Sequence, residues 1–343
     1  MKQLSIIIPV YKVEQYIRPC IESIYRQELN EDIFEVIIIN DGTPDNSMDM
    51  ISDLIAQHQN IVVINQENKG MSIARNNGLK IATGDYIAFL DSDDVWINNC
   101  IKPLLLIASN YQPDMIIGDY IRLDDKDILS YKHPVEKLYN KDISLTCGKD
   151  LFLTDLSPHE CFVWRNLYKR TFLEDNNIHF IPGIFFEDIP FIHNCYIKAK
   201  KCIRIHWLIY IYRLWGHSTT NSLNAGKTRD YCTAIYKTWE LNQTDGIDPS
   251  IYNKLKNNVL AQVSTVLYSI SKYIKNYNEA SSAIMHVKQI LPLLPLNNGM
   301  KPRMLRFFIN RTPFTYLFIR RMYGIIIEDH IRPFLRSKKC LLK

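Results

Sequence analysis

The chain of 343 residues is 47% hydrophobic, which is enough to bury the core of a large α/β domain and a further unit. Its net charge of +5 is uneven: residues 301–343 hold eleven Lys or Arg and two acidic residues, a local +9 that leaves residues 1–300 at −4. No run approaches the ~18 apolar residues of a membrane-spanning helix, because Arg213, Arg320 and Arg321 interrupt the best candidates.

Targeting and redox signals are sparse. The eight cysteines form no C-x-x-C pair and have no histidine at zinc-ligand spacing, so we expect reduced, mostly buried thiols. The apolar stretch from Leu4 contains Pro9 and continues into Lys12 and Glu14 without a small-residue cleavage site, unlike a signal peptide. We therefore expect a cytoplasmic protein.

Short apolar runs alternate with helical stripes over the first hundred residues, in the order βαβαβαβ. The expected strands are residues 5–10, 34–39, 61–64 and 86–90. The runs Ile6–Ile8 and Ile37–Ile39 are apolar on both faces, as in parallel strands covered by helices on each side. Ligands bind beyond the carboxyl ends of such strands, and these ends carry Tyr11, Asp41 and Asp91.

The pattern changes after residue 100. We expect a strand at Met115–Tyr120, a polar loop at Asp124–Lys132 and another strand at Ile203–Leu214, as the second half of the same domain. Beyond residue 228 the chain is expected to be helical, because Tyr252–Ile274 contains neither Gly nor Pro; Pro292–Pro302 predicts a break.

The first strand ends in Pro9-Val10-Tyr11-Lys12-Val13-Glu14, where a dinucleotide-binding protein would carry a glycine-rich turn. A tyrosine at this place is able to lie against a flat base. In isolation, the alternative is that Tyr11 is a packing aromatic and Glu14 a first-turn helix residue.

The second strand ends in a turn-forming cluster, Asn40–Asp45, in which Asp41 is able to accept the N–H of a uracil ring. The alternative is a plain turn and helix cap. Next come Asn68-Lys69-Gly70 and a helix with Arg75, whose fork of donors suits a phosphate. The alternative for Arg75 is a solvated surface charge.

Acidic residues surround the fourth strand, and three of them, Asp91, Asp93 and Asp94, follow its end. Carboxylates packed so closely repel one another unless a cation is present, and hard divalent ions take oxygen ligands that diphosphate completes. The D-x-D spacing therefore predicts a metal-diphosphate site. The alternative is an acidic helix N-terminus capped by Asp93 or Asp94.

These four segments together, in this order, resemble the catalytic domain of glycosyltransferase family 2. The matching stretches are Ser5–Tyr11, Ile39–Thr43, Asn68–Gly70 with Ala74–Asn76, and Gly84–Asp94. The resemblance implies an α/β fold, a GT-A (Rossmann-like) nucleotide-diphospho-sugar transferase domain with a C-terminal helical extension. It implies a catalytic domain over residues 1–225, with a nucleotide-binding half (1–100) and an acceptor half (101–225), followed by a helical region (226–343) with a basic amphipathic tail.

The resemblance also implies roles for single residues. Asp93 and Asp91 would hold a divalent metal, Mn²⁺ or Mg²⁺, with Asp93 the better direct ligand. Lys12 departs from the asparagine often found at its position. The implied donor-binding residues are Pro9, Tyr11, Glu14, Asp41, Asn68, Gly70, Arg75, Asp91, Ser92, Arg213 and Ser218.

Farther along, Phe185–Phe191 resembles the acceptor-side segment of the family. Asp188 is the candidate general base, and Glu187 would bind an acceptor hydroxyl or raise the pKa of Asp188. The alternative for Asp188 is an N-cap, since Pro190 follows near the first helical position. Tyr212-Arg213 and Gly216–Thr219 resemble the loop that closes over the diphosphate. His217 would add a metal ligand there, and the alternative is a solvated loop histidine.

The implied function is inverting, metal-dependent transfer of a hexosyl or N-acetylhexosaminyl group from a UDP-sugar to a glycan or lipid-linked glycan acceptor in surface polysaccharide synthesis. The alternative is a non-catalytic nucleotide-sugar-binding scaffold, against which the retention of Asp91, Asp93 and Asp188 speaks. An enzyme that forms sugar nucleotides would need a glycine-rich loop after the first strand, which is missing.

The tail of residues 301–343 alternates cations with bulky apolar residues, which suits a helix in an anionic membrane interface. This predicts a peripheral position at the inner face of the cell membrane. The alternatives are a helix packed on the protein or one that binds a partner protein. Nucleic acid is not expected as a partner, because the aromatic and basic residues follow helix packing.

Overall fold

The computed structural model describes residues 2–128, 131, 143–214, 223–295, 307, 309–315 and 317. The chain forms two compact units, residues 1–216 and 217–343. The sequence predicts the division at 225.

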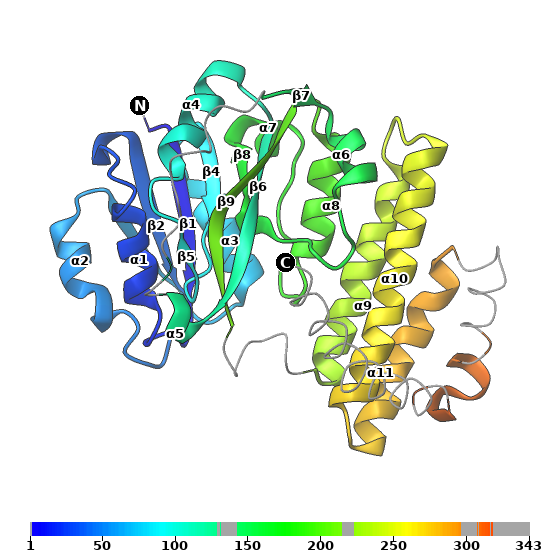
Figure 1. Ribbon diagram of the computed structural model, residues 1–343. Helices are drawn as coiled ribbons and strands as arrows, with labels where there is room; N and C mark the ends of the chain where they lie inside the picture. The colour runs from blue at the N-terminus through cyan, green and yellow to red at the C-terminus, as the bar shows by residue number, and fades with distance from the viewer. Residues whose placement is uncertain are drawn as a thin grey trace, which may run out of the picture. The chain divides into compact units, whose positions relative to one another are not determined.

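The first unit is built on one mixed β-sheet (Figure 1). Its strands in the described chain are β1 (Leu4–Val10), β2 (Phe34–Asn40), β3 (Ile61–Asn65), β4 (Tyr86–Phe89), β5 (Val95–Trp96), β6 (Met115–Asp124), β7 (Leu145–Thr146), β8 (Asn166–Lys169) and β9 (Cys202–Leu214). Their spatial order is β3-β2-β1-β4-β8-β6-β9-β5, and β7 pairs with β9. The parallel strands β1 and β2 are buried on both faces, which explains their unbroken apolar runs.

The directions of the strands determine the sheet edge at which the candidate site lies. The pairings of β1 with β2 and β4 are parallel, whereas β8 is antiparallel to both β4 and β6. Two antiparallel steps restore the direction, and β9 is parallel to β6. The carboxyl ends of β1, β2, β4, β6 and β9 therefore lie at one edge of the sheet.

Helices cover both faces of the sheet. They are α1 (Ile17–Tyr25), α2 (Ser52–Gln57), α3 (Met71–Ile81), α4 (Ile101–Tyr111), α5 (Asp125–Ile128), α6 (Gly148–Thr154), α7 (Arg170–Asp175) and α8 (Asp188–Lys198). On one face Ile7 packs against α3, where a Cβ on Gly78 would lie 2.5 Å from it. On the other face Ile6 and Ile8 share a core with residues of α1 and α4.

The second unit contains the helices α9 (Ala225–Glu240), α10 (Pro249–Tyr273) and α11 (Tyr277–Ile290), which pack on one another. α10 begins where Asp248 caps the amides of Ser250 and Ile251 and Pro249 occupies the first turn. Its buried residues recur every three or four positions, which forms one apolar face.

Part of the basic tail is described, and it packs within the second unit. Phe314 stacks on Tyr277 with ring centroids 4.6 Å apart, and Ile309 and Leu317 are buried. The other residues of 301–343 lie outside the described chain, so membrane contact stays a prediction. Within the described residues, no helix combines the length and apolar character that crossing a membrane requires.

The α/β fold with a helical extension is confirmed, and each strand and the long helix expected from the sequence is present. The expected polar loop after β6 is partly wrong, because Asp125–Ile128 form the short helix α5; residues 129, 130 and 132 lie outside the described chain. The seven described cysteines are free thiols, and all but Cys147 are buried, as expected.

Candidate active site

Asp41, after β2, is 4% exposed and holds the loop that follows β3. Its Oδ1 accepts hydrogen bonds from the Gln66 side chain at 2.7 Å and the Lys69 amide at 2.8 Å, and its Oδ2 accepts from the Gly70 amide at 2.9 Å. No helix begins at Asp41 in the described chain, so the helix-cap alternative is wrong. A carboxylate has about four acceptor positions, so one remains for a ligand.

Two glycines allow this loop to close. Gly70 has φ +85° and Gly42 has φ +65°, in the region that glycine adopts without strain. A Cβ on Gly42 would lie 2.9 Å from the backbone nitrogen of Asn68. Asn68 itself is exposed. The two strand-end loops therefore approach each other more closely than another residue at Gly42 would permit.

The loop after β1 is tied to the loop after β2. The Lys12 amide donates to Thr43 Oγ1 at 2.8 Å, and the Glu14 carboxylate accepts from the Asn46 amide at 3.1 Å. Lys12 has φ +55°, a conformation that asparagine tolerates better than lysine. Pro9 is buried in β1, whereas Tyr11 is 40% exposed at the sheet edge.

The three carboxylates after β4 have different surroundings. Asp94 is 1% exposed and accepts hydrogen bonds from the Tyr210 hydroxyl at 2.8 Å and the Arg213 amide at 2.7 Å. Burial, followed by the charges of Asp93 and Asp91, raises the pKa of Asp94 well above its usual range. The chain continues into β5 and not into a helix, so the helix-cap alternative for Asp93 or Asp94 is wrong. The Asp94 carboxyl therefore binds other residues of the protein in its interior.

Asp91 and Asp93 are partly exposed, and Ser92 between them is buried. Among the described residues, no group of three or more His, Cys, Asp or Glu is arranged to hold a metal ion. A hard cation such as Mg²⁺ is often bound by one or two carboxylates together with phosphate oxygens, and these two residues fit that mode.

Arg213 lies at the end of β9 and is 4% exposed. Its Nε donates to the Asp93 carbonyl oxygen at 2.6 Å, one Nη pairs with Asp125, and its Cζ is 4.9 Å from the Tyr16 ring centroid. Its Nη2 is buried without a hydrogen-bond partner in the described structure. A phosphate contact through this nitrogen stays a prediction. His217 and Ser218 lie outside the described residues.

Arg75 of α3 is 2% exposed and joins two carboxylates from distant segments. Its Nη2 donates to Asp91 Oδ1 at 2.7 Å and its Nη1 to Glu187 Oε1 at 2.5 Å. The guanidinium also lies 5.4 Å from the Phe180 ring centroid. The alternative of a solvated surface charge is therefore wrong. A phosphate contact stays a prediction, because both terminal nitrogens already bind carboxylates.

Asp188 is the first residue of α8, and the N-cap is Glu187, which makes no side-chain cap bond. The N-cap alternative for Asp188 is therefore wrong. Burial and then the charge of Glu187 raise the pKa of Asp188 to about 8. Burial also raises the pKa of Glu187, although Arg75 opposes this. Phe186 has φ +67°, a strained conformation for a large side chain, immediately before the pair.

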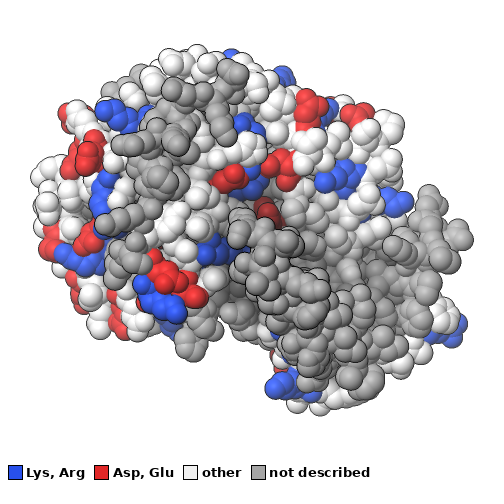
Figure 2. All heavy atoms as spheres, in the orientation of Figure 1, with Lys and Arg blue, Asp and Glu red and all other residues white. Residues whose placement is uncertain are grey.

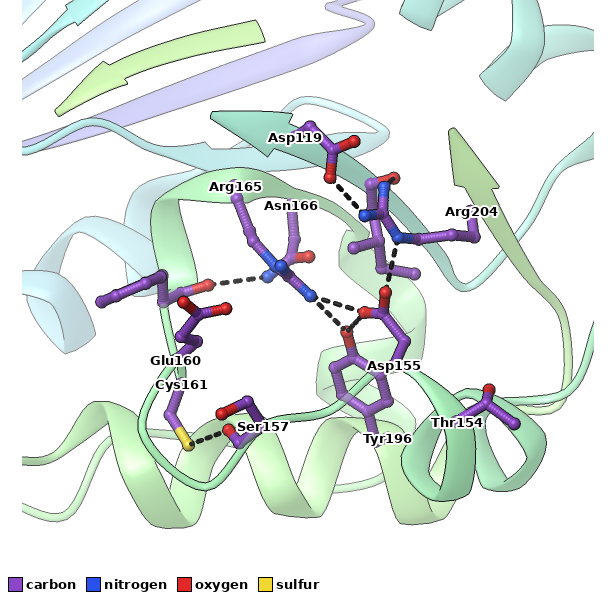
Figure 3. Close-up of polar contacts among 12 residues, drawn as sticks. Asp119, Thr154, Asp155, Ser157, Glu160, Cys161, Arg165, Asn166, Tyr196 and Arg204 are labelled. Carbon is purple, nitrogen blue, oxygen red and sulfur yellow. Dashed lines mark hydrogen bonds and ion pairs between the residues drawn. The ribbon is translucent and has the colours of Figure 1, made fainter. Parts of the chain in front are cut away.

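A partly buried ion-pair network supports the acceptor half (Figure 3). Asp155, after α6, accepts from Arg204 Nε of β9 at 2.8 Å and from Arg165 Nη2 at 2.6 Å. The Tyr196 hydroxyl of α8 donates to Asp155 at 3.2 Å, and Arg204 also pairs with Asp119 of β6. The network thereby ties α8, the helix that begins at Asp188, to β9 and β6.

Sequence reasoning missed three features: the bridging role of Arg75, the Tyr210 contact with Asp94, and the Asp155 network. The partners lie between ten and 116 positions apart. Spacing along the chain carries no signal for them, and only the Glu-Asp pair and the D-x-D were visible as motifs.

The known proteins that this chain resembles are glycosyltransferases. The family model described as glycosyl transferase family 2 matches residues 5–172. An uncharacterised glycosyltransferase of Haemophilus influenzae is 30% identical over 230 residues, which cover 66% of this chain and 81% of that protein. The chain belongs to glycosyltransferase family 2.

Two other similar proteins come from Bacillus species. The uncharacterised glycosyltransferase EpsJ of Bacillus subtilis is 35% identical over 63% of this chain and 62% of EpsJ. The poly(ribitol-phosphate) beta-glucosyltransferase of Bacillus spizizenii is 31% identical over 58% of this chain and 30% of that enzyme. The chain thus spans less than two thirds of the length of either relative.

Solved structures confirm the GT-A fold expected for family 2. S. aureus TarS 1–349 in complex with UDP-GlcNAc has a TM-score of 0.67 at 18% identity and covers 94% of this chain and 89% of its own. The mannosyltransferase PcManGT of Pyrobaculum calidifontis, in complex with GDP-Man and Mn²⁺, has a TM-score of 0.55 at 12% identity, over 96% and 88% of the two chains. At these identities the likeness establishes the fold alone.

Proposed function

We propose that the chain is an inverting glycosyltransferase that transfers a hexosyl or N-acetylhexosaminyl group from a UDP-sugar to an acceptor hydroxyl. The observation that carries the proposal is the Arg75 bridge, which joins the donor-side Asp91 to Glu187, the neighbour of Asp188. A donor-side carboxylate and a candidate base are thereby held in one connected group, as a single displacement requires.

The base in this proposal is Asp188. As the acceptor oxygen attacks the anomeric carbon, its proton passes to the Asp188 carboxylate. The bond from the anomeric carbon to the diphosphate breaks, and its electron pair leaves on the diphosphate oxygen. The raised pKa of Asp188, about 8, favours this role, because a general base works best when its pKa lies near the working pH.

The donor side follows from the strand-end loops. Tyr11 presents an exposed ring to a flat base, and Asp41 retains an acceptor position for a ring N–H, which uracil offers. Asp93 and Asp91 would hold the divalent metal, which supplies charge neutralisation on the departing diphosphate. The UDP-GlcNAc bound to TarS and the Mn²⁺ in PcManGT support this choice of donor and metal.

The acceptor is proposed to be a glycan or lipid-linked glycan of a surface polysaccharide. The name of the poly(ribitol-phosphate) beta-glucosyltransferase relative supports this class. A lipid-linked acceptor would suit the peripheral membrane position predicted for the tail, which stays a prediction.

The test is UDP release from a panel of UDP-sugars with Mn²⁺ or Mg²⁺, with and without EDTA. The variants are Asp93→Ala and Asp188→Asn, with Asp175→Asn as a matched control because this exposed carboxylate ends α7. We expect release that disappears in EDTA and in both site variants but persists in the control. UDP binding without turnover under any acceptor condition would favour the scaffold alternative, and absence of UDP binding would refute the proposal.

A further inference from the structure

An aromatic stack leads away from the D-x-D segment. Tyr210, whose hydroxyl binds Asp94, stacks on Trp164 with ring centroids 4.1 Å apart, and Trp164 stacks on Phe162 at 4.7 Å. Tyr120 of β6 meets Trp164 and Phe162 edge-on, at 5.0 and 5.3 Å. These contacts form a continuous row of rings whose first member touches the candidate active site.

Arg122 lies at the other end of this row. Its Cζ is 5.4 Å from the Tyr120 ring centroid and 5.9 Å from the centroids of Phe162 and Tyr212. Its Nη2 donates to the Tyr120 hydroxyl at 3.2 Å. The residue is exposed, whereas the three rings are half-buried. The guanidinium is thus held against aromatic rings at the surface.

Among the described residues, no carboxylate forms an ion pair with Arg122. Each of the other arginines in the described part of the first unit lies within 4.0 Å of a carboxylate, and Arg122 does not. Glu160 is linked to Arg122 only through the Tyr120 hydroxyl, which donates to Glu160 at 3.1 Å. On the face shown in Figure 2, several of the described basic side chains lie beside acidic ones, and others stand apart from them.

Arg122 also lies toward the acceptor half of the site. β6 runs in the direction of β4, so Arg122, near the end of β6, is at the same sheet edge as the D-x-D. Cys161, the neighbour of Phe162, has its Sγ 3.7 Å from Nδ1 of His193, a residue of α8. The row of rings therefore lies beside α8, the helix whose first residue is the candidate base.

We propose that Arg122, with the rings of Tyr120, Phe162 and Tyr212 beneath it, forms a subsite for a phosphate group of the acceptor. A planar guanidinium that is stacked on rings and lacks a carboxylate partner keeps donors available for two phosphate oxygens. The phosphate is that of a polyol-phosphate chain or of a lipid-linked diphosphate. The place of this subsite in the reaction rests on the proposed function.

The test is a binding titration of the full-length protein with two probes, a ribitol-phosphate oligomer and a short-chain prenyl diphosphate. We expect Arg122→Gln to weaken the binding of one probe by about tenfold, the usual effect of losing a charge-assisted hydrogen bond, and Arg122→Lys to weaken it less. The matched control is Arg26→Gln, an exposed arginine at the C-cap of α1. The probe that loses affinity identifies the source of the phosphate.

The proposal is overturned if neither probe binds the wild type, or if Arg122→Gln binds both as the wild type does. UDP affinity and UDP release without acceptor are measured on the same variants, and we expect Arg122→Gln to leave both unchanged. A wild-type protein that binds a probe through Arg122 but neither binds UDP nor turns over would refute the proposed function and leave the subsite standing. Loss of UDP affinity in Arg122→Gln would refute the separate subsite.

Discussion

Arg75 Nη2 lies 2.7 Å from Asp91 Oδ1, and this ion pair of a buried arginine with a partly exposed aspartate connects helix α3 to the end of strand β4. Because the same guanidinium binds Glu187, its position couples the donor side of the site to the start of α8. An arginine suits this role better than a lysine, since its fork reaches two carboxylates in fixed geometry.

Replacement of Arg75 by Met is expected to lower the free energy of unfolding by about 3–5 kcal/mol, because it leaves Glu187 and Asp91 without their counter-charge. We expect kcat for UDP release to fall by roughly 100-fold or more. Urea unfolding and the UDP-release assay measure the two effects. Arg75→Lys should fall between wild type and Arg75→Met, and a Met variant with wild-type stability would contradict the bridge.

The activity is expected to depend on pH through Asp188. The carboxylate must be deprotonated to accept a proton, and its pKa is raised to about 8. The value of kcat/KM should therefore rise as the pH increases toward 8 and level off above it. Values of kcat/KM measured from about pH 5.5 to about pH 9.5 span this pKa and test the effect. A profile already flat from pH 6 upward would argue against Asp188 as the base.

The same pKa predicts a change in stability. The folded pKa of Asp188 is raised above its unfolded value, so the folded state binds the proton more tightly. The stability contributed by the protonated carboxyl is fully present below about pH 4 and is lost as the pH rises through about 8. Asp188→Asn should show a shallower decline in unfolding free energy over this range. Equal slopes in urea titrations of the two proteins would contradict the prediction.

The left-handed conformation of Lys12 offers a stabilising substitution. Lys12 has φ +55°, and Lys12→Asn should raise the unfolding free energy by about 0.5–1 kcal/mol, because asparagine adopts this conformation at lower cost. Lys69→Asn is the control, since Lys69 is a loop lysine without positive φ. Chemical denaturation of both variants measures the difference, and a destabilised Lys12→Asn would show that the lysine side chain itself supports the loop.

Removal of the metal with EDTA distinguishes a metal needed for catalysis from one needed for folding. Because the protein is expected to supply only Asp93 and Asp91, EDTA should abolish UDP release while leaving the unfolding free energy in the absence of UDP unchanged. Thermal unfolding with and without EDTA provides the measurement. A fall in the melting temperature of the UDP-free protein would indicate a resident structural metal instead.

The sequence alone determined the strand order along the chain, the family and the edge at which the site lies. Runs such as Ile6–Ile8 identify buried parallel strands, and parallel strands present Tyr11, Asp41 and Asp91 at one edge. These properties are local, since they depend on periodicity and on residues within a few positions of one another.

Only the tertiary structure decided what each charged side chain binds. Arg75 meets Glu187 across 112 positions and Asp94 meets Tyr210 across 116, distances over which no periodicity operates. The same holds for Arg122, which has no carboxylate partner in the described part of the chain, because the fold decides which carboxylates come near it. Burial and partner choice arise from packing, and packing is what a single sequence does not display.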